Sequence, residues 1–155
     1  MTRPRRLDDV DLQIIRSLQK DGRRAYVDIA ADLNLAPSTV QQRVNRLMED
    51  GMLEVRAVTD PLAMGVPVTA TIAIEVDGAR LVEIANALTA FEEIGWVAIC
   101  TGSYDLLTEI ACQDNDDLIR LLTEISGIAG VRSTETFMYL RIVKNTYQWG
   151  IPKAL

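Results

Sequence analysis

Hydroxyl, amide and guanidinium side chains recur along one side of a predicted helix, and they are Ser38, Thr39, Gln42, Asn45 and Arg46. At about 100° per residue, these five lie opposite the apolar side of the helix or close beside that opposite side. None of them is acidic, and their functional groups can reach the base edges and phosphates of duplex DNA. The pattern predicts a helix that reads a major groove, with Arg43 contacting phosphates.

This predicted reading helix is the second of two helices that a short break separates. Both have apolar residues at helical spacing, namely Tyr26, Ile29, Ala30 and Leu33 in the first and Val40, Val44, Leu47 and Met48 in the second. Pro37 suits the first position of the second helix, which leaves Ala36 as an N-cap without a side-chain oxygen. Gly51 suits the position just past its end. Two apolar stripes that must share one core predict a helix-turn-helix.

An earlier helix and a following strand complete the expected first domain, residues 1–57. Asp8 or Asp9 can cap the earlier helix. Its apolar side carries Val10, Ile14 and Leu18. Residues 52–58 alternate weakly, which suggests a strand or wing beside the helix-turn-helix. Residues 58–66 contain Asp, Pro and Gly and are expected to form a linker strand or hinge.

Arginines outside the helix-turn-helix could add contacts to DNA, and they are Arg3, Arg5, Arg6, Arg23 and Arg24. The first three form a basic arm that a minor groove could accept, and a solvated terminus explains them equally well. The other two either contact phosphate or form a solvated corner. Their place beside the helix-turn-helix favours phosphate.

Residues 67–155 follow a different pattern. Every second residue from Val66 to Val76 is apolar, which is typical of a half-buried strand. Two amphipathic helices are expected whose apolar residues, starting at Leu81 and at Leu118, have identical spacing, and further strands are expected at 94–100, 106–112 and 131–143. The order βαββαβ predicts an α+β, ferredoxin-like domain with both helices on one face of an antiparallel sheet. A second copy of the sheet is the simplest cover for the other face, so we expect a homodimer, with Trp96 in the sheet face or interface.

Composition disfavours catalysis and metal binding. The 155 residues include no histidine, the commonest general base and metal ligand. Asp114, Asp116 and Asp117 stand where a helix begins, so capping explains them better than a metal. We expect no catalytic residue, no metal and no cofactor.

The net charge of −6 is unevenly distributed. Residues 1–57 carry ten Lys/Arg against nine Asp/Glu, whereas residues 58–155 carry six against thirteen. A local basic patch steers a protein to phosphate, so global acidity does not exclude DNA binding. No apolar run reaches the roughly 18 to 20 residues of a membrane span, and no signal peptide is apparent. We expect a cytoplasmic protein without a membrane partner.

Two cysteines, Cys100 and Cys112, fall in the arms of a predicted hairpin. With a two-residue turn at 103–104, Cys100 would face Leu107 and Cys112 would face Gly95. The two sulfurs would then lie in different rows of the ladder, so we expect reduced core cysteines.

This combination resembles the Lrp/AsnC family of bacterial and archaeal regulators, also called feast/famine regulators. The resemblance covers nearly the whole chain, and its most specific segments are LDDVDLQIIRSLQKDGR, STVQQRVNRLMEDGMLE, the turn Thr101–Asp105 and VRSTET at 131–136. It implies a DNA-binding transcriptional regulator that forms dimers and higher oligomers. Dimer symmetry implies a near-palindromic site on double-stranded DNA. The family resemblance also implies an amino acid or related small metabolite as effector, bound between dimers.

The resemblance further implies an effector site, whose residues would be Gly102, Ser103, Tyr104, Asp105, Thr134 and Thr136. Gly102 would let a ligand approach the backbone closely, and Asp105 could accept a hydrogen bond from an ammonium group. Threonine hydroxyls could bind a carboxylate. The alternative is a plain β-hairpin in which Gly102 and Asp105 serve backbone geometry alone.

Siroheme decarboxylases are similar over both domains, so an enzyme of that kind is the alternative function. Those enzymes depend on histidine, which this chain lacks. A stand-alone oligomerisation or ligand-buffering module is a third possibility, and the complete helix-turn-helix argues against it. The sequence therefore favours a regulator.

Overall fold

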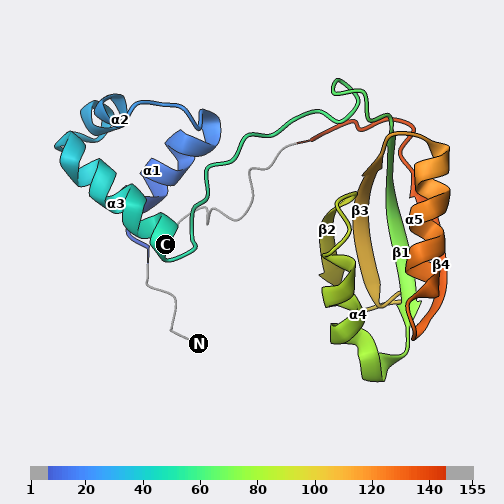
Figure 1. The fold of residues 1–155 in the computed structure, drawn as a ribbon. Coiled ribbons are helices and arrows are strands. Elements are labelled where there is room, and N and C mark those ends of the chain that lie inside the picture. The colour runs from blue at the N-terminus through green and yellow to red at the C-terminus, as the bar shows by residue number, and fades with distance from the viewer. Residues whose placement is uncertain (1–6, 146–155) are drawn as a thin grey trace. The chain divides into compact units, whose positions relative to one another are not determined.

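The computed structural model describes residues 7–145, and the chain divides into two compact units (Figure 1). Of the described residues, the first unit contains 7–58 together with 144–145, and the second runs from Thr59 to Val143. The division falls at the start of the segment 58–66, where the N–H of Val66 donates to the carbonyl of Pro61 at 2.8 Å. Within the described residues no helix is long and apolar enough to cross a membrane.

The described part of the first unit contains three helices, namely α1 (Asp9–Lys20), α2 (Tyr26–Leu33) and α3 (Pro37–Glu49). Asp8 is the N-cap of α1, and Ala36 precedes α3 without a side-chain cap, as predicted. The helices share one core, whose buried members are Ile14, Leu18, Ile29, Ala30, Val40 and Val44. The three apolar stripes seen in the sequence therefore meet, and the predicted helix-turn-helix is confirmed.

Two expectations for this unit are wrong. Met48 is 45% exposed, because the buried stripe of α3 ends at Leu47 and Met48 lies about 100° further round the helix. Residues 52–58 form no strand in the described chain. A strand needs a neighbour for its backbone hydrogen bonds. Within residues 7–145, no backbone hydrogen bond pairs 54–58 with another segment.

The second unit has the predicted βαββαβ order, with an added 3-10 turn. Its elements are β1 (Val68–Val76), η1 (Gly78–Arg80), α4 (Leu81–Leu88), β2 (Ile94–Ile99), β3 (Leu106–Cys112), α5 (Asn115–Gly127) and β4 (Val131–Met138). The strands form one antiparallel sheet in the order β2-β3-β1-β4 (Figure 1). Ile84 and Leu121 of the helices share a buried core with Ile72 of the sheet. This is the ferredoxin-like α+β fold.

The last strand is shorter than predicted. It ends at Met138 rather than Val143, because Met138 pairs with Ala70 and the N–H of Tyr139 bonds to Thr69 at 2.9 Å. Since β1 begins at Val68, residues 140–145 have no part of β1 beside them to continue the ladder.

The predicted hairpin register is also wrong by two residues. Ile99 faces Leu106, and the N–H of Cys100 bonds to the carbonyl of Asp105 at 2.9 Å, so four residues rather than two form the loop. Toward β2, Ile94 pairs with Ile110 and the N–H of Ala111 donates to Glu93, so Cys112 lies beyond Gly95 and does not face it. Both cysteines are free, as expected, and Cys112 is buried in the core.

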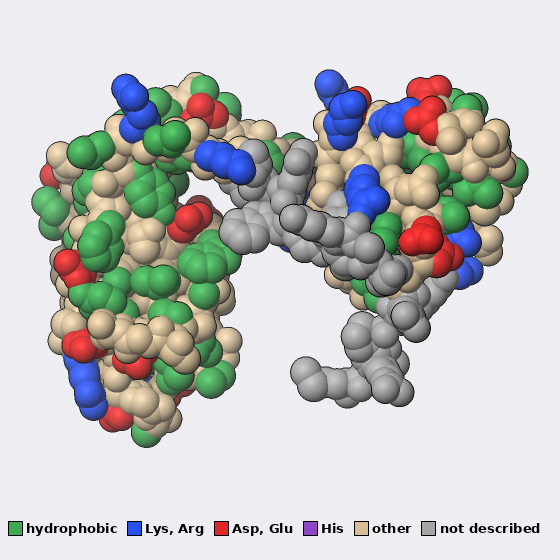
Figure 2. All heavy atoms as spheres, turned by 180° about the vertical axis from the view of Figure 1, so that it is seen from behind, with side chains coloured by type: hydrophobic (Ala, Val, Ile, Leu, Met, Phe, Trp, Pro, Cys, Tyr) green, Lys and Arg blue, Asp and Glu red, His purple; other side chains and the backbone are tan. Residues whose placement is uncertain are grey.

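The sheet face away from the helices carries a row of directly paired residues, Trp96, Glu109, Thr71 and Phe137. Trp96 is 50% exposed and Phe137 is 47% exposed. The hydroxyl of Tyr139 lies within hydrogen-bonding distance of Thr71 Oγ1 at 2.5 Å and Glu109 Oε1 at 3.2 Å. Figure 2 shows the second unit from behind, and hydrophobic side chains spread over the surface that faces the viewer there. We call this outer side of the sheet the open face.

Gly130 is required for the turn into β4. Its φ is +96°, and a Cβ there would lie 3.1 Å from Ile84 Cδ1 and 3.2 Å from Arg80 Cδ. We expect Gly130→Ala to lower the free energy of unfolding by about 1–3 kcal/mol, because both the backbone and the contact become strained. Chemical denaturation measures this change. Gly78→Ala is the control, since its Cβ would meet nothing within 4 Å. Equal stability of the two variants would contradict this account.

Candidate functional site

The polar side of α3 is exposed, as a DNA-reading surface requires. Ser38, Gln42, Asn45 and Arg46 are exposed and Thr39 is half-buried, while Val40 and Val44 on the other side are buried. The helix contains one acidic residue, Glu49, at its last position. Pro37 at the start lacks an N–H, and no side chain caps this end. The exposed side therefore offers hydroxyls, amides and one guanidinium.

Gln41 belongs to the same surface, and the sequence analysis missed it. Its side chain is exposed. Side chains four positions apart in a helix point in directions only about 40° apart, so Gln41 lies beside Asn45. That spacing was visible in the sequence. The predicted polar side of the helix should therefore have included Gln41.

Arg43 does not have the surroundings expected of a phosphate contact. Its guanidinium lies 2.7 Å from a carboxylate oxygen of Asp8 and 2.7 Å from one of Asp11, and its side chain is only 26% exposed. Asp11 is buried at 2% exposure. In this structure Arg43 therefore joins α3 to the start of α1, where carboxylates neutralise its charge. No sequence pattern indicated this pairing.

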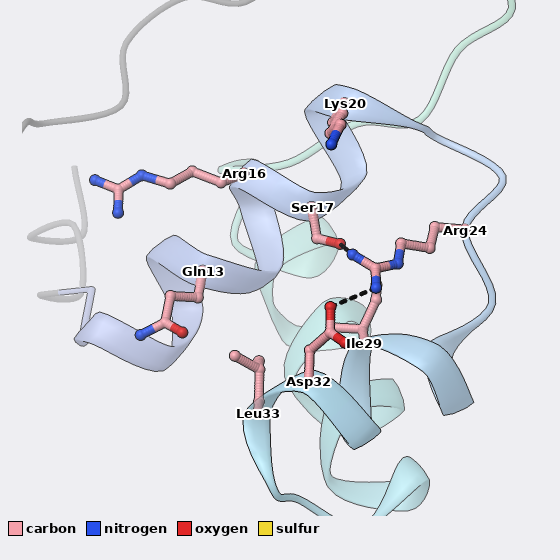
Figure 3. Close-up of a pocket in the computed structure, with 8 residues that line it drawn as sticks. All are labelled: Gln13, Arg16, Ser17, Lys20, Arg24, Ile29, Asp32 and Leu33. Carbon is pink, nitrogen blue, oxygen red and sulfur yellow. Dashed lines mark hydrogen bonds and ion pairs between the residues drawn. The ribbon is translucent and has the colours of Figure 1, made fainter.

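The two arginines after α1 differ from each other. Arg24 donates to Ser17 Oγ at 2.8 Å and forms an ion pair with Asp32 of α2 (Figure 3). Arg23 is exposed, and only its backbone N–H has a described bond, to Asp21 Oδ1 at 2.9 Å. Arg23 is thus better placed than Arg24 for a phosphate.

A hollow of about 330 Å³ lies between α1 and α2, and its lining residues are Gln13, Arg16, Ser17, Lys20, Arg24, Ile29, Asp32 and Leu33. In Figure 3, Arg24 points toward Ser17 and Asp32, whereas Arg16 points away from them.

The predicted arm residues Arg3, Arg5 and Arg6 lie outside the described residues, and their contact with a minor groove stays a prediction.

The loop between β2 and β3 holds four of the predicted effector residues. Gly102 has φ +131° and an added Cβ would meet nothing within 4 Å, so the loop leaves open space there. Ser103 is exposed. Asp105 accepts from the N–H of Val76 at 2.9 Å and donates its own N–H to Ile74 at 3.0 Å. Part of the role of Asp105 is therefore structural, as the plain-hairpin alternative supposed.

The other two predicted effector residues, Thr134 and Thr136, lie on β4, on the side opposite the residue that Tyr104 contacts. Tyr104 donates its hydroxyl to Glu135, whose strand partner Ala73 faces the open side. Thr134 and Thr136 pair with the core residues Ile74 and Ile72, so these half-buried threonines face the helices. A single chain brings Tyr104 to β4 but does not bring its hydroxyl to the same side of the sheet as the two threonines.

The described residues include no group of three His, Cys, Asp or Glu side chains that could hold a metal ion. Asp114 is instead the N-cap of α5 and accepts from the N–H of Asp117 at 2.8 Å. The capping interpretation of this acidic group is confirmed.

Asp8 makes the first unit sensitive to acid. The hydrogen bond from Arg43, followed by that from the N–H of Asp11, holds the pKa of Asp8 below its usual range. A carboxyl whose folded pKa is lowered stabilises the fold above its unfolded pKa of about 3.9, and this contribution is lost as pH falls through the folded value. We expect the thermal unfolding midpoint to fall below about pH 4, and to fall less in Asp8→Asn. Circular dichroism melts across this range check it, and equal acid sensitivity of both proteins would contradict it.

Comparison with known proteins places both units in one family. Residues 7–48 match the AsnC-type helix-turn-helix domain, and residues 69–149 match the Lrp/AsnC ligand binding domain. The HTH-type transcriptional regulator FL11 of Pyrococcus furiosus is 36% identical over 141 residues, which cover 90% of this chain and 93% of FL11.

Solved structures agree with this match. The leucine response regulatory protein LrpA of Mycobacterium tuberculosis has a TM-score of 0.84 and 28% identity, covering 94% of this chain and 100% of LrpA. The regulator NMB0573 of Neisseria meningitidis, in complex with L-Met, has a TM-score of 0.82 and 22% identity, covering 94% of this chain and 97% of its own, and shows the same fold. Because the matched domains and FL11 belong to regulators, the decarboxylase alternative gains no support. The chain belongs to the Lrp/AsnC family of transcriptional regulators.

Proposed function

We propose that this regulator binds a near-palindromic site on double-stranded DNA as a homodimer and responds to an amino acid or a related small metabolite. It acts in the cytoplasm, together with the DNA it binds. The observation that carries the proposal is the exposed, polar side of α3, where Gln42 and Arg46 face away from the core. Groups of these types form bidentate hydrogen bonds with adenine and guanine.

In the proposed complex, α3 of each subunit enters a major groove. Ser38, Thr39, Gln42, Asn45 and Arg46 contact bases or the nearby backbone, and Arg23 contacts phosphate. Two-fold symmetry of a dimer requires two half-sites related by the same symmetry, about 34–36 Å apart for one helical turn. A near-palindromic sequence is the DNA that satisfies this condition.

Selection from random duplexes, followed by mobility-shift titration, tests this proposal. We expect the selected sequence to bind at least about 1,000-fold more tightly than a scrambled duplex of equal length. Affinity should also fall steeply as salt rises, because bound phosphates release counterions. Equal affinity for every duplex at each salt concentration would rule the proposal out.

The open face of the sheet is the proposed dimer interface. Trp96 and Phe137 each remain about half exposed in a single chain. The segment after β4 adds apolar side chains, since Leu140 is 99% exposed and Val143 is 90% exposed. Exposed apolar patches of this kind are typical of protein interfaces. A second copy of the sheet would remove these side chains from water. Further association of dimers into a higher oligomer is part of the same proposal.

The loop from Gly102 to Asp105 is the proposed effector contact, completed by Thr134 and Thr136 where dimers meet. Open space at Gly102 and the hydroxyls of Ser103 and Tyr104 support a small polar ligand. The fold of the Neisseria regulator, which is in complex with L-Met, supports an amino acid as the ligand class. In this proposal a second dimer supplies the remaining contacts to the effector.

A thermal-shift screen of the twenty amino acids checks the effector proposal. A ligand that binds only the native protein at about 100 times its Kd adds about 2.7 kcal/mol to the free energy of unfolding, so its unfolding midpoint rises. We expect Gly102→Val to abolish the shift, because a side chain fills the open space. Gly65→Val is the matched control, since Gly65 also has a positive φ and nothing within 4 Å of its Cβ. A screen without any shift would contradict an amino-acid effector.

A further inference from the structure

Arg43 contacts the residues that start α1, and it does so from the middle of α3. One guanidinium nitrogen donates to Asp8 Oδ2 and to Asp11 Oδ1, each at 2.7 Å. The Arg43 side chain is half-buried, and Asp11 is buried. The pair of contacts therefore forms in a partly desolvated position, where charged hydrogen bonds hold a fixed geometry.

The same two carboxylates also form the capping box of α1. Asp8 Oδ1 accepts from the N–H of Asp11 at 2.8 Å, and Asp11 Oδ2 accepts from the N–H of Asp8 at 3.3 Å. Each carboxylate thus uses one oxygen to cap α1 and the other to hold Arg43. The first turn of α1 and the middle of α3 are joined through one set of four oxygens.

We infer that Arg43 is a positioning residue that sets the rotation of α3 and thereby the placement of Gln42 and Arg46 for reading bases. This inference rests on the proposed DNA-binding function. Apolar contacts of Val40 and Val44 hold α3 in the unit, but hydrophobic contact is non-directional and permits small rotations. The two ion pairs of Arg43 restrict the rotation of α3 about its own axis, which apolar contacts alone do not.

A small rotation is enough to disturb base reading. With side chains, a helix has a radius of about 5–6 Å, so a turn of about 20° moves its outer surface by about 2 Å. Hydrogen bonds to bases tolerate only a few tenths of an ångström around about 2.9 Å. Loss of the ion pairs should therefore lower sequence-specific affinity while leaving contacts with phosphates largely unchanged.

The alternative is that Arg43 leaves the carboxylates and contacts a phosphate when DNA binds. The two roles predict opposite results for Asp8→Asn, which removes an anion and keeps a good N-cap. A phosphate-contacting Arg43 would be released, and DNA would bind equally well or more tightly. A positioning Arg43 would lose a partner, and specific affinity would fall.

The test compares wild type, Asp8→Asn and Arg43→Met as full chains, on the selected duplex and on a scrambled duplex, at several salt concentrations. We expect both variants to lose at least about 10-fold in the ratio of specific to non-specific affinity, a loss within the range of one base contact. Non-specific affinity and its salt dependence should change little. Circular dichroism at the assay temperature shows that each variant is folded. If Arg43→Met does not fold, Asp8→Asn decides the question.

Asp32→Asn is the matched control, because Asp32 of α2 also pairs with an arginine, Arg24, and the described contacts of that pair do not include a residue of α3. Its affinity ratio should equal that of wild type. An unchanged ratio in Asp8→Asn, or a salt slope that shrinks by about 0.9 per subunit in Arg43→Met, would overturn the positioning role. Absence of any sequence preference in wild type would overturn the proposed function as well. The two failures are therefore distinguishable.

Discussion

Replacing Gln42 and Arg46 together by alanine should lower affinity for the selected duplex at least about 100-fold. Each good bidentate contact with a base contributes about 1–3 kcal/mol of discrimination, and about 1.4 kcal/mol corresponds to a factor of ten. Both side chains are exposed, so their removal should change the free energy of unfolding by no more than about 0.5 kcal/mol. Mobility-shift titration on the selected and scrambled duplexes measures the effect.

The control for this double variant is Gln13→Ala with Lys20→Ala. It also removes one amide and one cation from the first unit, but from α1 at the hollow between α1 and α2. Because charge is matched, a general electrostatic effect would weaken both double variants alike. We expect the control to keep its preference for the selected duplex. Equal losses in the two double variants would show that α3 does not read bases.

The second large effect is expected at the open face, where Phe137→Glu should raise the Kd of the dimer by at least about 1,000-fold. A two-fold interface contains each residue twice, and burying one phenyl ring contributes roughly 2 kcal/mol. Two rings therefore contribute about 4 kcal/mol, or about three powers of ten in Kd. Burial of the two introduced carboxylates would make association of the variant less favourable still. Sedimentation equilibrium measures the association.

Val82→Glu is the control for the interface variant. Val82 is 62% exposed on α4, a helix that covers the opposite face of the sheet. The same change of an exposed apolar residue to glutamate should leave association unchanged there. A monomeric wild type, or a Phe137→Glu variant that associates as strongly as wild type, would exclude the open face as the interface.

Periodicity in the sequence predicts most of this fold, because the burial of one side of each helix or strand imposes that periodicity. Alternation in β1 and the i, i+3, i+4, i+7 pattern in the helices follow from which side chains must leave water. The errors fall where non-local partners decide. Residues 52–58 alternate but have no partner strand in the described chain, and β4 stops where β1 begins. Local sequence carries no information about such pairing.

For the candidate site, exposure could be predicted and contacts could not. Helical geometry placed Gln42, Asn45 and Arg46 on an exposed side, which the structure confirms. It did not reveal that Arg43 contacts Asp8, which is 35 positions away in the chain. A single arginine on the edge of a polar face looks the same in sequence whether it meets phosphate or a distant carboxylate.

The hydrogen bond from Val76 to Asp105 also bears on how an effector signal would travel. Val76 lies at a bulge where the pairing of β1 with β4 shifts register. Any molecule that draws the Asp105 carboxylate toward itself takes an acceptor from that bulge. The β2–β3 loop and the outer edge of the sheet are thus mechanically connected through one amide. Movement of the Asp105 carboxylate would therefore disturb a hydrogen bond at the point where the pairing of β1 with β4 changes register.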